Sequence, residues 1–332
     1  MNVSKDLEDL ATYVLGMGSG HDLARAYFVG SGSEANEAAL KMARHPAYDY
    51  QYTREGETEG QFAARLVDEV EAEFKRIGPE KIVSLIAEPV VGATSACVAA
   101  PKGYFKGIRR LCDKYDNLLH LDEIMCGVGR TGSYFAFEQE GDIFPDIVTI
   151  GKGPGGRYIP IAAMLVSRKV VEVIRRGTSA FNHGQTFQAH PVACAAGLAV
   201  QEILRRDGLV ARAKTMGTTL EKLLREAFRG CKYVGDIRGR GLFWALEFVR
   251  DKETRESFIP SVRFGPRVQH TAFEMGVAVY PGVGTVDGLR GDHVLIAPPL
   301  NISSEDLGKA VSTIRKAYGK VERDYDSVVY KI

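Results

Sequence analysis

Short apolar runs alternate with amphipathic stretches over residues 1–207. The runs are rich in β-branched and aliphatic side chains, as buried strands are, and they lie at 26–29, 81–87, 118–121, 147–151 and 162–167. Segments with the helical period of apolar positions separate or follow them, at 61–77, 103–115, 168–176 and 191–206. This alternation predicts an α/β fold built on an open sheet.

The pattern changes at about residue 208. Beyond it we expect a strand at Gly241–Val249 and long amphipathic helices at 208–229, 262–275 and 303–323. The sequence therefore predicts a large domain of residues 1–207 and a smaller C-terminal domain of residues 208–332. A chain of 332 residues, of which 45% are hydrophobic, can bury a sizeable core.

Composition narrows the classes of function. The 43 basic and 42 acidic residues nearly balance, which leaves no field to attract nucleic acid or an anionic membrane. The five cysteines lack a CxxC or Cys/His ligand pattern, so we expect no disulfide framework, no metal site and a reducing compartment. No leader-like start or membrane-length apolar run occurs. We expect a cytoplasmic protein acting on small molecules. A mitochondrial location stays open, because the chain begins as if within a helix.

Lys152 ends the apolar run Ile147–Gly151 and is followed by the glycine-rich run Gly153–Gly156. Glycine and proline oppose a helix, so we expect Lys152 at the carboxyl end of a strand, where open α/β sheets bind ligands. Burial there lowers the pKa of a lysine and makes its neutral amine a nucleophile toward carbonyl carbon. Taken alone, Lys152 is better explained as a surface lysine in a glycine-rich turn.

Residues 26–44 combine a short strand, the turn Gly30–Ser33 and a strongly helix-forming stretch. Such a turn aims backbone N–H groups and the positive end of a helix dipole at one point, which suits a phosphate. Gly30, Gly32 and Ala35 also match the dinucleotide fingerprint of a nucleotide-dependent oxidoreductase. That fingerprint also requires a second apolar strand that ends in an acidic residue about twenty residues later. Residues 50–56 are polar and do not form such a strand, so the match is weak.

Asp122 and Glu123 follow the apolar run 118–121. A P-loop ATPase places such acids on its magnesium strand, but the chain contains no GxxxxGK[ST] sequence. A carboxylate facing the same crevice as Lys152 can instead pair with a protonated pyridine nitrogen. Taken alone, Asp122 also fits a helix-capping or turn acid.

An amine, a carboxylate and a phosphate turn are together what pyridoxal phosphate requires. Several motifs, in this order, resemble the class III aminotransferases of the fold-type I family: GSGSEANEAALKMAR (30–44), AEPVVGA (87–93), LDEIMCGVGRTG (121–132), IGKGPGG (150–156), HGQTFQAHPVACAA (183–196), IRGRGLFWALEFV (237–249) and HVLIAPPL (293–300). The resemblance implies a mostly parallel central sheet with helices on both faces and a smaller C-terminal α/β domain. It also implies pyridoxal 5'-phosphate as the cofactor.

Carried over to matching positions, the resemblance makes Lys152 the Schiff-base lysine and proton carrier. Asp122 would pair with the pyridinium nitrogen, and Ile124 would pack on one face of the ring. Gly32 and Ser33 would hold the phosphate.

The resemblance further implies that Thr186 reaches the phosphate from the neighbouring subunit of an obligate homodimer. Glu88 would be a second acid satisfied within the site. Met125 stands where the family commonly has glutamine, which removes a hydrogen bond to the cofactor's ring oxygen. Pro154 and Arg157 replace the usual leucine and glycine beside the lysine.

Two departures bear on the substrate. Leu295 stands where members acting on α-amino acids carry an arginine, and Ala93 where they carry a glutamate. Both departures resemble the branch that acts on ω-amino acids and amines. In that branch a mobile-loop arginine, here most like Arg290, meets the carboxylate of the acceptor in a bidentate pair. A solvated turn residue explains Arg290 equally well.

One segment of the family pattern is missing. Arg44 is followed directly by residues 45–52, where family members continue through a further helix and an aromatic-His-Gly motif that stacks on the cofactor. The N-terminal portion that helps to close the active site and the dimer is also lacking. We therefore expect this chain to bind pyridoxal phosphate weakly and to turn over slowly.

The sequence thus predicts an aminotransferase that moves an amino group from a primary amine or ω-amino acid to a 2-oxo acid by ping-pong half-reactions. A decarboxylase, racemase or aminomutase of the same fold remains an alternative, because lysine and aspartate serve them all. A truncated, non-catalytic family member is a further alternative, and an oxidoreductase is a remote one.

Overall fold

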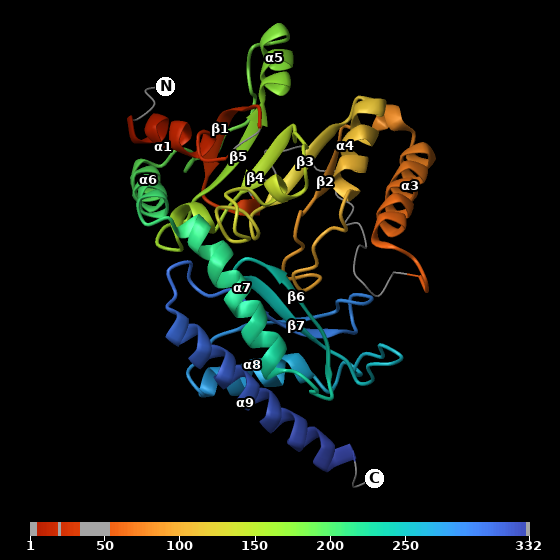
Figure 1. The fold of residues 1–332 in the computed structure, drawn as a ribbon. Coiled ribbons are helices and arrows are strands. Elements are labelled where there is room, and N and C mark those ends of the chain that lie inside the picture. Colours follow the sequence, from red (N-terminus) through yellow and green to blue (C-terminus); the bar gives the residue numbers. More distant parts are fainter. Residues whose placement is uncertain (1–4, 19–20, 34–53, 330–332) are drawn as a thin grey trace. The chain divides into compact units, whose positions relative to one another are not determined.

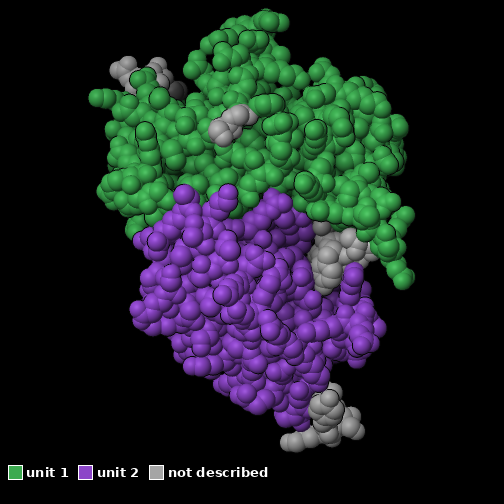
Figure 2. All heavy atoms as spheres, viewed as in Figure 1, with its two compact units in different colours: residues 1–89, 100–210 green, residues 90–99, 211–332 purple. Residues whose placement is uncertain are grey.

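The computed structural model describes residues 5–18, 21–33 and 54–329. It divides into two compact units, one of residues 1–89 and 100–210 and the other of residues 90–99 and 211–332 (Figure 2). The helix expected at 34–44 lies outside the described residues, as does the segment from residue 45 to 53.

A five-stranded sheet forms the centre of the first unit (Figure 1). Its strands, in spatial order, are β1 (Leu23–Val29), β5 (Ala162–Ser167), β4 (Ile147–Ile150), β3 (Leu118–Glu123) and β2 (Ser84–Ala87). The predicted α/β fold is confirmed. Strands β2, β3 and β4 are parallel, whereas β5 runs antiparallel to both of its neighbours, so the described sheet is mixed. The reason is local: residues 151–161 return the chain from β4 without the crossover helix that a parallel neighbour needs.

The unit begins with helix α1 (Lys5–Leu15). Its other described helices begin and end close to the predicted positions, at α3 (Glu59–Ile77), α4 (Tyr104–Tyr115), α5 (Arg168–Arg176) and α6 (Pro191–Arg206). Short 3-10 turns lie at η2 (Pro79–Lys81), η3 (Ala136–Gln139) and η4 (Gly153–Gly155). Helix α3 starts with a capping box, in which Thr58 and Gln61 satisfy each other's backbone N–H groups. Helix α4 buries Tyr104, Phe105 and Ile108.

The second unit contains an antiparallel sheet of order β6-β7-β9-β8. Its strands are β6 (Val234–Arg240), β7 (Phe243–Phe248), β9 (Asp292–Ile296) and β8 (Tyr280–Val283), and its helices are α7 (Leu209–Ala227), α8 (Phe264–Glu274) and α9 (Ser304–Val329). Leu220, Phe248, Phe264 and Tyr318 meet in its apolar core. In the part of the chain that the structure describes, no helix is both long and apolar enough to cross a membrane.

The close approach of α7 to the β6–β7 turn gives a stability prediction. A Cβ atom at Gly217 would lie 2.3 Å from the carbonyl oxygen of Gly241, whereas one at Gly308 in α9 meets nothing within 4 Å. We expect Gly217→Ala to lower the free energy of unfolding by about 1–3 kcal/mol, because the backbone must shift. Gly308→Ala should raise it by up to about 1 kcal/mol, since alanine favours a helix.

Denaturant unfolding followed by the fluorescence of Trp244, the chain's single tryptophan, measures both changes in the second unit. Equal effects of the two substitutions would show that α7 does not approach the turn as closely as described.

Candidate active site

Two neighbouring parallel strands carry Asp122 and Lys152 to one edge of the sheet. The register pairs Asp122 of β3 with Thr149 of β4, and Glu123 with Ile150. Lys152 follows β4 after one intervening residue. Parallel strands end at the same edge, so the predicted placement of Lys152 beyond a strand end agrees with the structure.

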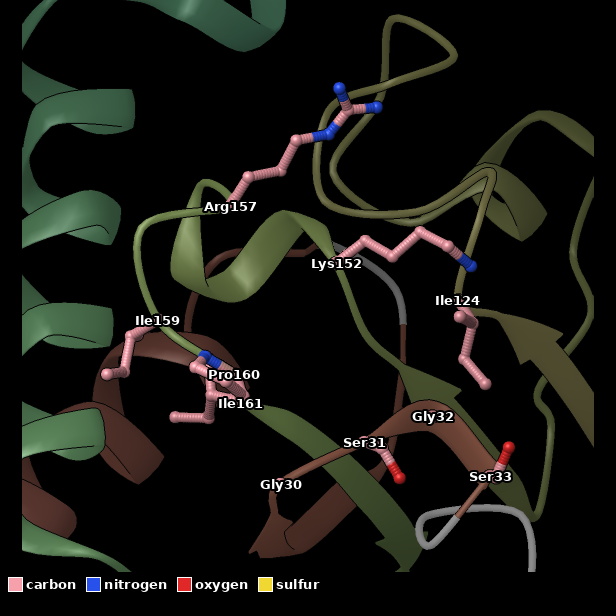
Figure 3. A pocket seen from close by; sticks show the side chains of 10 residues that line it. All are labelled: Gly30, Ser31, Gly32, Ser33, Ile124, Lys152, Arg157, Ile159, Pro160 and Ile161. Atoms are coloured by element: carbon pink, nitrogen blue, oxygen red, sulfur yellow. The ribbon is translucent and has the colours of Figure 1, made fainter. Parts of the chain in front are cut away.

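A pocket of about 480 Å³ lies at this edge (Figure 3). Its lining comes from the turn after β1, the residue after β3 and the segment after β4, and consists of Gly30, Ser31, Gly32, Ser33, Ile124, Lys152, Arg157, Ile159, Pro160 and Ile161. Four of the residues predicted for a cofactor site, Gly32, Ser33, Ile124 and Lys152, therefore share one pocket. Asp122 and Glu88 act on Lys152 through their charges.

The protein lowers the pKa of Lys152 from its ordinary value. The main cause is loss of hydration around the ammonium group, even though the side chain reaches solvent through the open side of the pocket. The carboxylates of Asp122 and Glu88 oppose this change, and the charge of Arg157 adds to it. A lower pKa leaves a larger share of the amine neutral, and the neutral amine is the nucleophile.

The backbone of Lys152 is strained. Its φ of 56° and ψ of −64° place it at the centre of a γ-turn, in which the N–H of Gly153 donates to the carbonyl oxygen of Gly151 over 2.5 Å. This turn is rare, because a side chain at positive φ crowds the backbone. Glycine would fit the position without strain, so local folding does not explain the lysine.

Asp122 and the glycine turn both position Ile124. Oδ1 of Asp122 accepts a hydrogen bond from the N–H of Ile124 at 2.9 Å, which fixes the start of the loop after β3. A Cβ atom at Gly32 would lie 2.6 Å from Cδ1 of Ile124. A side chain at residue 32 would therefore require the Ile124 side chain to move, whereas glycine lets the turn and the isoleucine share this space.

Glu123 has a structural role that sequence reasoning did not assign. Its side chain is fully buried, and its two carboxylate oxygens accept from the N–H groups of Ala136 at 2.6 Å and Phe137 at 2.8 Å. Burial raises the pKa of Glu123 to about 8, although both N–H groups oppose the rise. The carboxylate ties the strand end to residues 136–137, and this holds the intervening loop with Ile124 at its start.

Four predicted site residues are not among those that line this pocket: Asp122 and Glu88, which act on Lys152 by their charges, and Thr186 and Arg290. Thr186 lies in a solvent-exposed turn, and Arg290 belongs to the second unit. Nε of Arg290 pairs with Oδ2 of Asp287 at 2.7 Å, and hydrogen bonds from Arg290 lower the pKa of Asp287 to about 2. The roles expected for Thr186 and Arg290 stay predictions.

The structure adds residues that the sequence did not assign to the site. Ser31 and the segment 159–161 line the pocket, and so does Arg157, which stands out in the sequence only as an arginine in a glycine-rich run. Within residues 5–18, 21–33 and 54–329, no group of three or more histidine, cysteine or acidic side chains is placed to hold a metal ion.

The sequence matches the family model of the aminotransferases of class III over residues 46–318. The chain belongs to the class III aminotransferases. An uncharacterised aminotransferase of Schizosaccharomyces pombe is 48% identical to it over 271 residues, which make up 82% of this chain and 59% of that protein. An aminotransferase of Gibberella zeae is 38% identical over 366 residues, covering 93% of this chain and 71% of that protein.

A solved structure has the same fold. The (S)-enantioselective omega-transaminase of Thermomicrobium roseum matches this aminotransferase chain with a TM-score of 0.84 and 30% identity, over 96% of this chain and 79% of that one. The predicted family and its fold are therefore confirmed, and the family depends on pyridoxal phosphate. The chain spans less than two thirds of the length of its Schizosaccharomyces pombe relative, 59%.

The strain at Lys152 predicts an inverted order of stability between alanine and glycine. We expect Lys152→Gly to be more stable than Lys152→Ala by about 1–3 kcal/mol, because glycine adopts the γ-turn freely. At Lys106, on the exposed side of α4, the order should be the usual one, with alanine more stable by about 1 kcal/mol.

Thermal unfolding of the four variants without added cofactor gives both differences. Alanine being the more stable replacement at both positions would show that residue 152 is not held in a strained turn.

Proposed function

We propose that this chain carries the amino-transfer site of a pyridoxal-phosphate-dependent aminotransferase. The reaction would move an amino group from a primary amine or ω-amino acid to a 2-oxo acid in two half-reactions. The observation that carries the proposal is the meeting of Lys152 and the turn Gly30–Ser33 in one pocket, with Asp122 at the adjacent strand end.

The residues present fit the cofactor in their chemistry. Lys152 offers an amine with a lowered pKa, and Asp122 offers a carboxylate within electrostatic reach of it. Gly32 brings the turn against Ile124, where any side chain would collide. Pyridoxal phosphate, when bound, supplies an aldehyde carbon and an electron-withdrawing ring.

Lys152 would act as the general base and general acid of the site. Its neutral Nζ is the base that takes a proton from the amine-bearing carbon of the substrate, and its protonated form returns one. Loss of hydration favours the neutral form. Asp122 and Glu88 favour the charged form but only partly offset this effect. Because the net change lowers the pKa of Lys152, the two states of Nζ lie closer in free energy at neutral pH than they do in an exposed lysine.

The other predicted residues would bind and orient. Asp122 would keep a proton on the ring nitrogen of the cofactor, and its hydrogen bond to the N–H of Ile124 holds the carboxylate in place. Ile124 would cover one ring face. Gly32 and Ser33 would take the phosphate, since both line the pocket beside Lys152 and Ser33 adds a hydroxyl.

A homodimer is part of the proposal. Large apolar side chains of the first unit are exposed, with Tyr158, next to Arg157 in the chain, at 87%, Phe187 at 71% and Val192 at 63%. Exposed apolar patches of this kind mark interaction surfaces. Thr186 lies next to Phe187, so a partner that covers this segment would bring a Thr186 hydroxyl to an interface.

The substrate class rests on two kinds of support. The first is that the chain has Leu295 and Ala93 at the positions where enzymes that act on α-amino acids carry an arginine and a glutamate. The second is that an omega-transaminase shares its fold. The role expected for Arg290, binding of the acceptor carboxylate, would require this arginine to release Asp287.

Incomplete cofactor binding also belongs to the proposal. The Gibberella zeae alignment runs over 366 residues while this chain has 332, so that relative contains residues within the matched span that this chain lacks. The family match begins at residue 46, directly after the Arg44–His45 junction. The alignment length supports the absence of an internal segment, and the start of the family match agrees with its place at that junction.

Replacing the lysine tests the chemistry. We expect Lys152→Ala to abolish turnover of an amine with pyruvate and the visible absorbance that pyridoxal phosphate gives on binding, because the amine that holds the cofactor is gone. Lys106→Ala should change neither. Full turnover by Lys152→Ala in a preparation free of the parent chain would show that Lys152 is not the catalytic lysine.

The missing segment gives a second prediction. Without one stacked aromatic ring the chain should bind pyridoxal phosphate more weakly by at least about 0.5–1.5 kcal/mol. A chimera with the corresponding segment of the Gibberella zeae relative inserted after Arg44 should recover this binding. Titration of the visible absorbance against cofactor concentration, with molar mass measured in parallel, compares the two chains. Equal affinity, together with a stable dimer and ordinary activity of the uninserted chain, would contradict the prediction.

A further inference from the structure

Arg157 places a second cation in the Lys152 pocket. It follows the glycine-rich run after Lys152 and lines the same pocket. In Figure 3 its guanidinium lies on the other side of Lys152 from the hydroxyls of Ser31 and Ser33. The pocket thus has a hydroxyl-rich glycine turn on one side and a guanidinium on the other.

The guanidinium of Arg157 has no polar partner in the part of the chain that the structure describes. Arg157 is exposed, and it makes no hydrogen bond or ion pair with any residue that the structure describes. Arg290, the arginine expected to bind substrate, is instead paired with Asp287. Toward the residues that the structure describes, Arg157 therefore keeps all five N–H donors unpaired.

The backbone at Arg157 also disfavours an arginine. Its φ is 68°, in the left-handed region that glycine adopts without strain, and it stands in a glycine-rich run. The side chain is exposed, so packing does not require it either. A strained residue that neither packing nor hydrogen bonding explains points to function.

The charge of Arg157 acts inside the pocket, because it lowers the pKa of Lys152. Two cations that face one cavity repel each other until an anion lies between or beside them. The turn with Ser31 and Ser33 suits a phosphate, which leaves the guanidinium for a second anion. Its planar fork matches the two oxygens of a carboxylate.

We propose that Arg157 binds the substrate carboxylate, so that the pocket selects 2-oxo acids and amino acids over uncharged aldehydes and amines. The identity of the reaction in this proposal rests on the proposed amino-transfer function. The recognition of a carboxylate depends only on Arg157 and its pocket.

Binding of a matched pair of probes tests the proposal without turnover. Propionate and propionamide have the same shape and differ in charge, and calorimetry with the cofactor-loaded chain gives both dissociation constants. We expect the parent chain to prefer propionate by about tenfold or more, the effect of a charged hydrogen-bonded pair. Arg157→Gln should abolish the preference, and Arg157→Lys should retain part of it.

Arg157→Gly separates the ligand role from a folding role. Glycine relieves the strain at 68°, so this variant should unfold at a higher temperature while losing the preference for propionate. The control is Arg255→Gly, an exposed arginine of the second unit with φ of 58°, which should gain stability without changing the preference.

Kinetics give a third measurement where turnover is present. Arg157→Gln should raise KM for pyruvate by about tenfold or more, with a smaller change in kcat and in KM for a primary amine donor.

Three results would overturn the proposal. In the first, the parent chain shows no preference for propionate. In the second, Arg157→Gln keeps the preference unchanged. In the third, Arg290→Gln loses the preference while Arg157→Gln retains it. Failure of the amino-transfer function shows itself separately, as absent visible absorbance and absent turnover in the parent chain.

Discussion

The parallel ladder between β3 and β4 is the constraint on which the site depends. Hydrogen bonds along this ladder pair Asp122 with Thr149 and Glu123 with Ile150, so the two strands end in a fixed register. A slip of one residue would turn every side chain of β3 to the opposite face. Asp122 would then exchange places with the buried Glu123, and the hydrogen bonds from Ala136 and Phe137 to Glu123 would be lost. The backbone pairing of β3 with β4 therefore decides which side chains lie at this edge of the sheet.

Glu123 extends this constraint into the loop that follows. Its buried carboxylate accepts from two consecutive backbone N–H groups, those of Ala136 and Phe137. An unpaired buried donor costs about 1–3 kcal/mol, so the pair strongly favours one loop conformation. The two neighbouring acids of β3 thus have different contacts. Asp122 accepts from the N–H of Ile124, and Glu123 holds the loop at residues 136–137.

Much of this arrangement could be predicted from the sequence, because the signals are local. Short apolar runs located β3, β4 and β5, helical periods located α4 to α6, and the glycines after Lys152 placed it beyond a strand end. The direction of β5 could not be predicted, since it depends on the path of residues 151–161 rather than on the composition of the strand. Neither could the positive φ angles of Lys152 and Arg157, which arise from the tertiary path of that same segment. Motif comparison showed only that Arg157 replaces the usual glycine. A motif describes where the expected residue lies, and it does not say where the side chain of a different residue would point.

The strained turn at residues 152–157 has a consequence for sequence design. A procedure that selects residues for stability on this backbone would place glycine at 152, where the γ-turn requires positive φ, and again at 157. It would thereby erase both cations of the pocket while improving the fold. On such a backbone, the positions at which a stability-optimised sequence disagrees most with the natural one are the positions to keep.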